Sequence, residues 1–396
     1  MKALMPQIRV WQMRPKVREG RGVVEEFMKP KRWMIPVLGH TLCASAMVLL
    51  GIQLGFAELR TLPSSWYPAS NLPSLHPKNS DSPWQGTAPS IQTLVVTPDG
   101  IVYAGSFGMG LFRSTNKGQS WDALNRGLTD PFLLCLAVTP GQHVYAGTMR
   151  GGVYRLSLKG EEWESISRGV EDTEVKSFLI HEGRVYAGTG QGVYQWVEAE
   201  QRWIKIGEGL EQVLVPGLAI LDDGRLLAAT SGKGLHHFQT DQTDQSQWVD
   251  SQSVFVDPRE RLPHRYLRVI AVNQAQHIFL GTQDGGIFRS TDRGLSWASL
   301  SRNLPNDSIR GIVPIGKDVV VATGRGIFRW KHDQQRWLAM NEGLTRLAIQ
   351  SLTIADTGDW YVGTSSGAFR SDDEGEHWKN ISKGLGLQMA PKGPYD

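Results

Sequence analysis

The sequence predicts an all-β fold, a seven-bladed β-propeller preceded by an N-terminal transmembrane or signal segment. A strand ending in YAGT or a variant of it recurs seven times, at intervals of 41 or 42 residues and once of 52. A tryptophan follows each of these strands, and 44 glycines supply the tight turns that many short strands need. The seven strands end around Gly105, Gly147, Gly188, Ala229, Gly281, Ala322 and Gly363. The seven tryptophans are Trp121, Trp163, Trp203, Trp248, Trp297, Trp337 and Trp378.

Each unit of about 41 residues contains four predicted strands. An apolar strand such as LAVTP is followed by one such as VYAGT, then by one such as GIFRS, and the fourth begins at the tryptophan. One such unit cannot bury both of its faces, whereas a ring of seven lets each tryptophan pack against the neighbouring unit. A parallel β-helix, the competing repeat fold, has shorter rungs and no antiparallel hairpins. The pattern therefore favours a propeller over residues 91–386, with a tail at 387–396.

Three units share an octet with the spacing S-x-D-x-G-x-x-W between the third and fourth strands. It reads STNKGQSW at 114–121, STDRGLSW at 290–297 and SDDEGEHW at 371–378. This spacing suits a tight turn, in which Asp292 accepts backbone N–H groups and Gly294 takes a positive φ. We expect the box residues to be structural. They are Ser114, Asn116, Gly118, Trp121, Ser290, Asp292, Gly294, Trp297, Ser371, Asp373, Gly375 and Trp378.

The octets resemble the Asp-box, or BNR, repeat. The full unit, roughly YAGTxxGGIFRSTDxGxSW, resembles the propellers known as photosystem II stability/assembly factor-like proteins and, more distantly, sialidase and sortilin-type propellers. The resemblance covers residues 91–386 and implies a WD40-like ring in which the box is a structural turn remote from the ligand face. Units two, three and six depart from the box. Because this family includes hydrolases, receptors and assembly factors, the resemblance specifies the fold more than the function.

The N-terminus predicts that the propeller is exported. Residues 1–32 are polar and basic, and residues 33–57 form a mostly apolar run of 25 that can span a bilayer with its basic flank in the cytoplasm. Alternatively, the chain read from Met28 begins with a signal peptide that is cleaved after Ala57. In both cases the propeller lies outside the cytoplasmic membrane, tethered in the periplasm or secreted. Residues 58–90, rich in Pro, Ser and Asn, are predicted to be a linker.

The charge distribution argues against a nucleic-acid partner. The formal charge of +3 arises in the N-terminal segment, and residues 61–396 carry 32 basic against 35 acidic side chains. A nucleic-acid-binding domain needs a basic surface that this balance does not provide. The two cysteines, Cys43 and Cys135, fall in an apolar run and a predicted core strand, so no disulfide is expected.

No catalytic set is recognisable in the sequence. Sialidases in the resembled family carry an Arg-Ile-Pro motif, an arginine triad and a tyrosine–glutamate pair; the motif is absent and the triad cannot be assigned. His236 and His237 point to opposite faces of a predicted strand, so we expect no metal and no cofactor. We therefore expect a non-enzymatic scaffold or assembly factor whose partner is a membrane protein complex or its unassembled subunit. The alternatives are a sialidase-like glycoside hydrolase and a carbohydrate- or ligand-sensing module.

The fourth unit carries the longest insertion, SVFVDPRERLPHRY at 253–266. In a propeller, connections from the fourth strand to the next blade share a face with the turns between the second and third strands. Arginine, methionine and aromatic side chains there indicate a docking surface, although a solvated loop without a role is the alternative. The candidate contacts are Arg259, Arg261, His264, Arg265, Arg150, Arg325, Phe107, Met109 and Met149. We expect Arg259, Arg261 and Arg265 to be the leading contacts with the partner.

Overall fold

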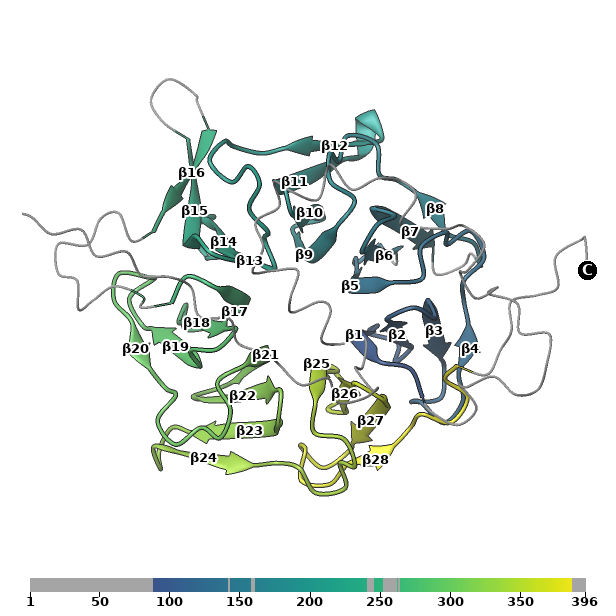
Figure 1. The fold of residues 1–396 in the computed structure, drawn as a ribbon, viewed down its shortest axis with the longest axis vertical. Coiled ribbons are helices and arrows are strands. Elements are labelled where there is room, and N and C mark those ends of the chain that lie inside the picture. Colours follow the sequence, from purple (N-terminus) through teal and green to yellow (C-terminus); the bar gives the residue numbers. More distant parts are fainter. Residues whose placement is uncertain are drawn as a thin grey trace, which may run out of the picture. The chain divides into compact units, whose positions relative to one another are not determined.

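A computed structural model describes residues 88–386, apart from 142, 158–160, 241–245, 252–261 and 263. Its strands form seven four-stranded antiparallel sheets, each built from four consecutive strands (Figure 1). We number these sheets blade 1 to blade 7 in chain order. The predicted seven-bladed β-propeller is therefore confirmed. The N-terminal transmembrane or signal segment and the tail lie outside the described residues, among which no helix is long and apolar enough to cross a membrane.

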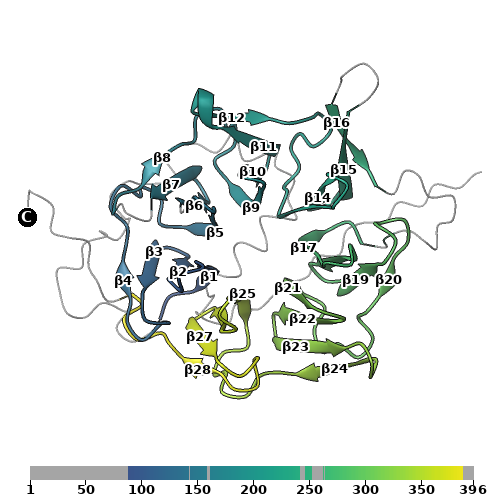
Figure 2. The same cartoon turned by 180° about the vertical axis from the view of Figure 1, so that it is seen from behind.

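The first two strands of each blade form its inner half. The first strands are β1 (Ile91–Val96), β5 (Leu133–Val138), β9 (Val175–His181), β13 (Gly217–Ile220), β17 (Leu267–Val272), β21 (Ile309–Ile315) and β25 (Ile349–Ile354). They surround the centre of the ring, and each contacts the first strands of the two neighbouring blades (Figures 1 and 2). The second strands are β2 (Val102–Ser106), β6 (His143–Thr148), β10 (Arg184–Thr189), β14 (Leu226–Thr230), β18 (Ile278–Thr282), β22 (Asp318–Thr323) and β26 (Trp360–Thr364).

The outer half of each blade holds the third and fourth strands. The third strands are β3 (Leu111–Ser114), β7 (Val153–Ser157), β11 (Gly192–Val197), β15 (Gly234–Thr240), β19 (Ile287–Ser290), β23 (Gly326–Lys331) and β27 (Gly367–Ser371). The fourth strands are β4 (Asp122–Ala123), β8 (Glu164–Ser165), β12 (Arg202–Lys205), β16 (Ser246–Asp250), β20 (Ala298–Ser299), β24 (Arg336–Ala339) and β28 (Lys379–Asn380). A 3-10 turn, η3 (Glu198–Glu200), joins β11 to β12.

The repeated tryptophan joins each blade to the one before it. In six of the seven blades the described residues show its indole Nε1 donating to a backbone carbonyl of the preceding blade. Trp203, which is 1% exposed, donates to the Ile166 carbonyl at 2.9 Å and packs its ring among the buried side chains of both blades. In blades 1, 2, 5 and 7 the tryptophan precedes the fourth strand by one residue, so the prediction that it opens this strand is wrong there.

In blades 2, 1 and 6 a glycine after the fourth strand allows this joint to close. Gly169 has a φ of +92°, and a Cβ built on it would lie 2.1 Å from the carbonyl oxygen of Trp203 in the next blade. Only glycine combines this backbone conformation with such a close approach. Gly127 and Gly343 occupy the same place and lie equally close to Trp163 and Trp378. The repeated glycine therefore belongs to the interface between blades rather than to a turn alone.

All three octets form one turn. Ser290 Oγ donates to Asp292 Oδ1 at 2.7 Å and accepts from the Gly294 amide at 2.7 Å, while Asp292 Oδ1 accepts from the Ser296 amide at 2.9 Å. The octets at 114–121 and 371–378 repeat this pattern, with Asn116 accepting as the aspartates do. Partial burial alone would raise the pKa of the Asp292 carboxyl, but hydrogen bonds from Ser296 and Ser290 lower it. The predicted turn geometry and the positive φ of Gly294, +93°, are confirmed.

The ring closes between blade 7 and blade 1 without exchanging a strand. Trp121 of blade 1 donates to the Ile381 carbonyl of blade 7 at 2.7 Å, as the other tryptophans do between their blades. The Gly367 amide donates to the Pro89 carbonyl at 2.8 Å, and Ser366 Oγ donates to the Ala88 carbonyl at 3.3 Å. The seam is therefore a repeat of the ordinary joint, reinforced by the residues that lead into β1.

Candidate functional site

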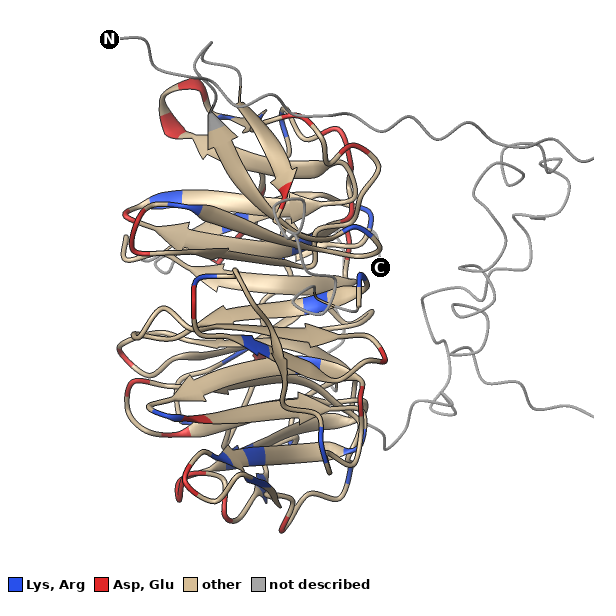
Figure 3. Ribbon diagram, turned by 90° about the vertical axis from the view of Figure 1, so that its left-hand side faces the viewer, with Lys and Arg blue, Asp and Glu red and all other residues tan. Residues whose placement is uncertain are grey.

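The propeller has two different faces. The turns between second and third strands lie on one face together with the connections from each blade to the next, because backbone hydrogen bonds join them. The Met149 amide donates to the Phe132 carbonyl at 3.0 Å, and the Gln283 amide donates to the Tyr266 carbonyl at 3.0 Å. We call this the connection face. The turns within the first and last hairpins of each blade, including the three octets, lie at the other ends of the strands, on the hairpin face (Figure 3).

An aromatic patch occupies the connection face where blades 1 and 2 meet. We define it as Phe107, Phe132, Met149 and Arg150. The Phe107 ring, 43% exposed, meets the Phe132 ring edge-on with 4.9 Å between centroids, and the Arg150 guanidinium lies 4.8 Å above the Phe132 ring. Met149 beside them is 38% exposed. The sequence predicted three of these residues, and Phe132 is the one that brings them together.

Buried Asp130 fixes the turn that carries Met149 and Arg150. Its Oδ2 accepts from the amides of Arg150 at 2.6 Å and Gly151 at 2.9 Å, and its Oδ1 accepts from the Phe132 amide at 3.2 Å. The carboxylate therefore holds the connection that carries Phe132 and the turn that carries Met149 and Arg150. A preorganised apolar surface of this kind loses little conformational entropy when a partner docks.

A second group of candidate residues lies between blades 4 and 5, and we call it the basic patch: Lys233, Arg265 and Tyr266. Arg265 donates to the Lys233 carbonyl at 3.2 Å and forms an ion pair with Asp250 at 3.5 Å. Its own backbone carbonyl accepts from the amides of Gly232 and Gly234, so the connection is tied to the turn. The Tyr266 ring is 56% exposed. Of the predicted leading arginines, 259 and 261 lie outside the described residues.

Three predicted contacts do not join either patch. His264 is only half exposed, because its ring lies against Phe288 at 5.9 Å and fills the space over Gly285. Met109 is partly buried against the core where blades 7 and 1 meet. Arg325 is exposed in blade 6, where its backbone amide donates to Thr323 Oγ1 at 3.0 Å and its side chain makes no hydrogen bond to a described residue. The sequence therefore placed these residues at connection-face positions but could not tell which of them point outward.

Six residues at the connection-face end of the first strands were not predicted from the sequence as candidate site residues. In six blades the pairing of the first and second strands shifts by one, which leaves the second residue of the first strand as a bulge. Bulges redirect a side chain away from the regular alternation of the sheet. The bulge residues are Gln92, Leu134, Lys176, Arg268, Arg310 and Gln350. Three of the six are cationic and none is acidic.

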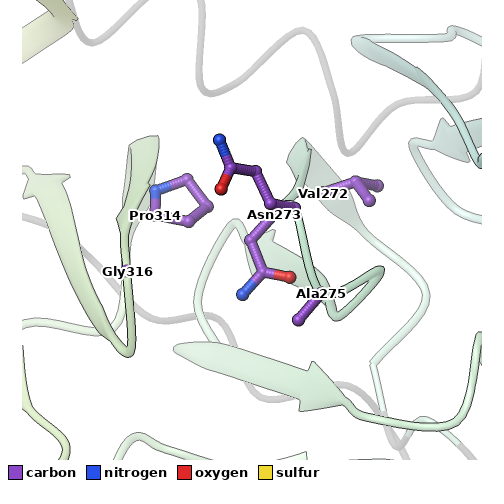
Figure 4. Close-up of a pocket in the computed structure, with 6 residues that line it drawn as sticks. Val272, Asn273, Ala275, Pro314 and Gly316 are labelled. Atoms are coloured by element: carbon purple, nitrogen blue, oxygen red, sulfur yellow. The ribbon is translucent and has the colours of Figure 1, made fainter.

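A pocket of about 380 Å³ lies on the hairpin face, where β17 and β21 end. Val272, Asn273, Gln274, Ala275, Pro314 and Gly316 line it. Figure 4 shows Pro314 on one side of the pocket and Asn273 and Ala275, from the neighbouring blade, on the other. Asn273 Oδ1 accepts from the His277 amide at 2.9 Å, so this carboxamide also shapes the turn. The lining offers neutral polar groups and apolar surface. Among the described residues no three His, Cys, Asp or Glu side chains gather as metal ligands would.

The comparisons with known proteins show the fold alone. The sequence matches no protein-family model and no curated protein. In structure the chain is similar to the extracellular domain of a putative hybrid two component system from B. thetaiotaomicron, with a TM-score of 0.57 and 15% identity over 72% of this chain. It covers 38% of that longer chain. It is also similar to the WD40 β-propeller domain of Doa1, with a TM-score of 0.55, 17% identity and coverage of 74% of this chain and 96% of that one.

A third similar structure comes from a surface protein. PorZ, described as a bacterial surface component of the type-IX secretion system of Porphyromonas gingivalis, matches with a TM-score of 0.53 and 16% identity. The match covers 78% of this chain and 40% of PorZ. These comparisons agree on a propeller, and two of the three proteins are described as extracellular or surface-exposed. The Asp-box and photosystem-factor resemblance remains a prediction.

Proposed function

We propose that this protein is a non-enzymatic, exported scaffold that binds a protein partner through its connection face and helps to assemble a membrane protein complex. The observation that carries the proposal is the aromatic patch. Phe107 and Met149 are exposed, and Asp130 holds the turn that carries Met149. Aromatic, methionine and arginine side chains are the types enriched at protein interfaces. The assembly role itself rests on the resemblance to photosystem assembly factors.

Two further observations support the proposed location and mode of binding. Structural neighbours of this fold include extracellular domains, which agrees with a propeller outside the cytoplasmic membrane. We propose that residues 33–57 tether it there or are removed after export. The basic patch extends the proposed docking surface to blades 4 and 5, where Arg265 is held by Lys233 and Asp250. Arginine forks at such a rim orient an acidic partner and accelerate its encounter more than they add affinity.

The aromatic patch predicts the result of a docking experiment. The double change Phe107→Ala with Met149→Ala should reduce recovery of the cross-linked native partner by about tenfold or more, since exposed anchors at interfaces cost about 1–2 kcal/mol each when truncated. The matched control is Leu295→Ala, because Leu295 is 60% exposed on an octet turn of the hairpin face. Quantitative mass spectrometry of partners captured by the full chain measures the effect. Equal recovery from both variants would exclude the aromatic patch as the docking surface.

The basic patch predicts a different dependence on salt. Arg265→Glu should weaken capture at low ionic strength, and the loss should shrink at high salt because screening removes the attraction. The control is Arg293→Glu, on the hairpin face. A loss independent of salt would argue against electrostatic steering.

Turnover of a fluorogenic sialoside by the full chain would instead favour the alternative, a glycoside hydrolase.

A further inference from the structure

Two arginines occupy equivalent bulge positions in neighbouring blades at the centre of the ring. Arg268 follows the first paired residue of β17, and Arg310 follows the first paired residue of β21. These two first strands contact each other. Since a bulge residue is left out of the ladder, both side chains leave the regular alternation at the same end of the central channel. The repeat therefore places two arginines at equivalent positions of neighbouring strands, near the connection-face mouth of the channel.

Arg310 is held in place by the next blade. Its Nη1 donates to the Ile349 carbonyl at 3.1 Å and to Gln350 Oε1 at 2.8 Å. Gln350 is itself the bulge residue of β25, so this bond runs along the ring of bulge residues. The Arg310 Nε is buried and has no hydrogen-bond partner among the described residues. Its Nη2 is not among the buried atoms and makes no hydrogen bond within the described residues, so the fixed guanidinium keeps this donor for a further acceptor.

Neither arginine is neutralised by a carboxylate. Within the described part of the chain Arg268 forms no hydrogen bond and no ion pair. The negative charge of Asp284 raises the pKa of Arg268 without bonding to it. Burial lowers the pKa of Arg268, and burial together with the adjacent positive charge of Arg268 lowers the pKa of Arg310. Both groups are therefore partly desolvated, and the positive charge of Arg268 opposes that of Arg310.

Three partly buried arginines on third strands behave differently. Arg155 pairs with Glu164 at 3.2 Å, Arg329 pairs with Asp318 at 3.0 Å, and Arg370 pairs with Asp359. These three have carboxylate partners, whereas Arg113 and Arg289, half-buried on two other third strands, form no ion pair among the described residues. Lys176, the bulge residue of blade 3, forms an ion pair with Glu174 at 3.0 Å. Among the bulge residues, Arg268 and Arg310 are therefore the two cations without an ion pair in the described part of the chain, and they lie in adjacent blades.

The geometry points to an anion-binding site at the channel mouth, in which Arg268 and Arg310 together hold the oxyanion group of a small ligand. Two guanidinium groups at one place suit a carboxylate or phosphate, because each fork can donate two parallel hydrogen bonds to such a group. The anion would take up the unused donors and remove the repulsion between the two cations. This site goes beyond the proposed docking function, since it needs neither the aromatic patch nor a protein partner.

Calorimetric titration of the full chain tests the site, with succinate and inorganic phosphate as the probes at constant ionic strength. We expect saturable binding of at least one probe, weakened about tenfold or more by Arg268→Gln or Arg310→Gln, because charge-assisted hydrogen bonds are lost. The matched control is Arg325→Gln, which removes the same charge from an exposed position on the same face. The variant Arg268→Gln should fold, since it removes a repulsion rather than a bond. Which probe binds identifies the oxyanion as carboxylate or phosphate.

A second measurement keeps the proposal testable if Arg310→Gln fails to fold. The bound probe should raise the Tm of the unaltered chain by mass action and leave that of Arg268→Gln unchanged. The proposal is overturned if neither probe binds in the millimolar range, or if Arg325→Gln weakens binding as much as Arg268→Gln does. It is also overturned if only a polyglutamate peptide binds, since the surface would then recognise an acidic chain rather than a small ligand.

Discussion

Trp203→Ala should lower the free energy of unfolding by about 3–5 kcal/mol, the range for truncating a fully buried large aromatic side chain. The Trp203 ring is 1% exposed and lies 5.5 Å from the Trp196 ring, and its indole Nε1 is the donor that reaches Ile166 of the preceding blade. The substitution removes the packing between two blades and leaves the Ile166 carbonyl without this donor. Denaturant-induced unfolding of the full chain, followed by tryptophan fluorescence and circular dichroism, measures the change.

Two companion variants separate the causes of this loss. Trp203→Phe keeps an aromatic ring but no donor, so its loss should be smaller, with about 1–3 kcal/mol assigned to the unsatisfied carbonyl and the change in ring size. Leu295→Ala, at an exposed position, should change stability by no more than about 0.5 kcal/mol. If Trp203→Ala destabilised the chain no more than Leu295→Ala, the tryptophan would not be what joins the blades.

Gly169→Ala should destabilise the propeller by about 3 kcal/mol or more, because it combines backbone strain with an overlap of atoms. The φ of +92° is unfavourable for alanine, and the new Cβ would lie 2.1 Å from the Trp203 carbonyl oxygen. Backbone atoms on both sides would have to separate, which loosens the joint between blades 2 and 3. The midpoint of denaturant unfolding reports the loss.

Gly183→Ala is the matched control for this prediction. Gly183 also has a positive φ, +76°, but a Cβ there would meet nothing within 4 Å. Its replacement should therefore cost only the conformational strain, about 1–2 kcal/mol. Equal losses for the two variants would show that the close approach to Trp203 adds nothing and that the repeated glycine serves the turn alone.

The repeat predicted the fold because the residues that define it act over short distances in the chain. Trp203 and its counterparts recur at a nearly constant interval, and Ser290, Asp292 and Gly294 bond within one turn. The interval and the turn spacing are therefore both visible in the sequence. The seven blades and the octet geometry follow from them. The role of Gly169 could not be read in this way, because the Trp203 carbonyl that it approaches belongs to the next blade.

The candidate site was predictable only as a face of the ring. Phe107, Met149 and Arg150 lie where the order of strands places them, but their grouping depends on Phe132, which comes from a different connection. His264 was expected outside and instead covers Gly285, since a half-buried ring gains more by packing on Phe288 than by remaining in solvent. Arg268 and Arg310 share one position of the repeat, yet only the one-residue shift in strand pairing reveals that this position is a bulge.

The seam between blades 7 and 1 makes the order of the blades along the chain nearly arbitrary. Every sheet is made of consecutive strands, and Trp121 closes the ring with the same bond that Trp163 and Trp203 make elsewhere. The two ends of the ring also meet, since a Cβ built on Gly386 would lie 3.4 Å from Pro89. A circular permutation that joins these ends and opens another connection would therefore keep every blade whole. In evolutionary terms, such a ring can grow by duplication and restart at any blade without losing its closure.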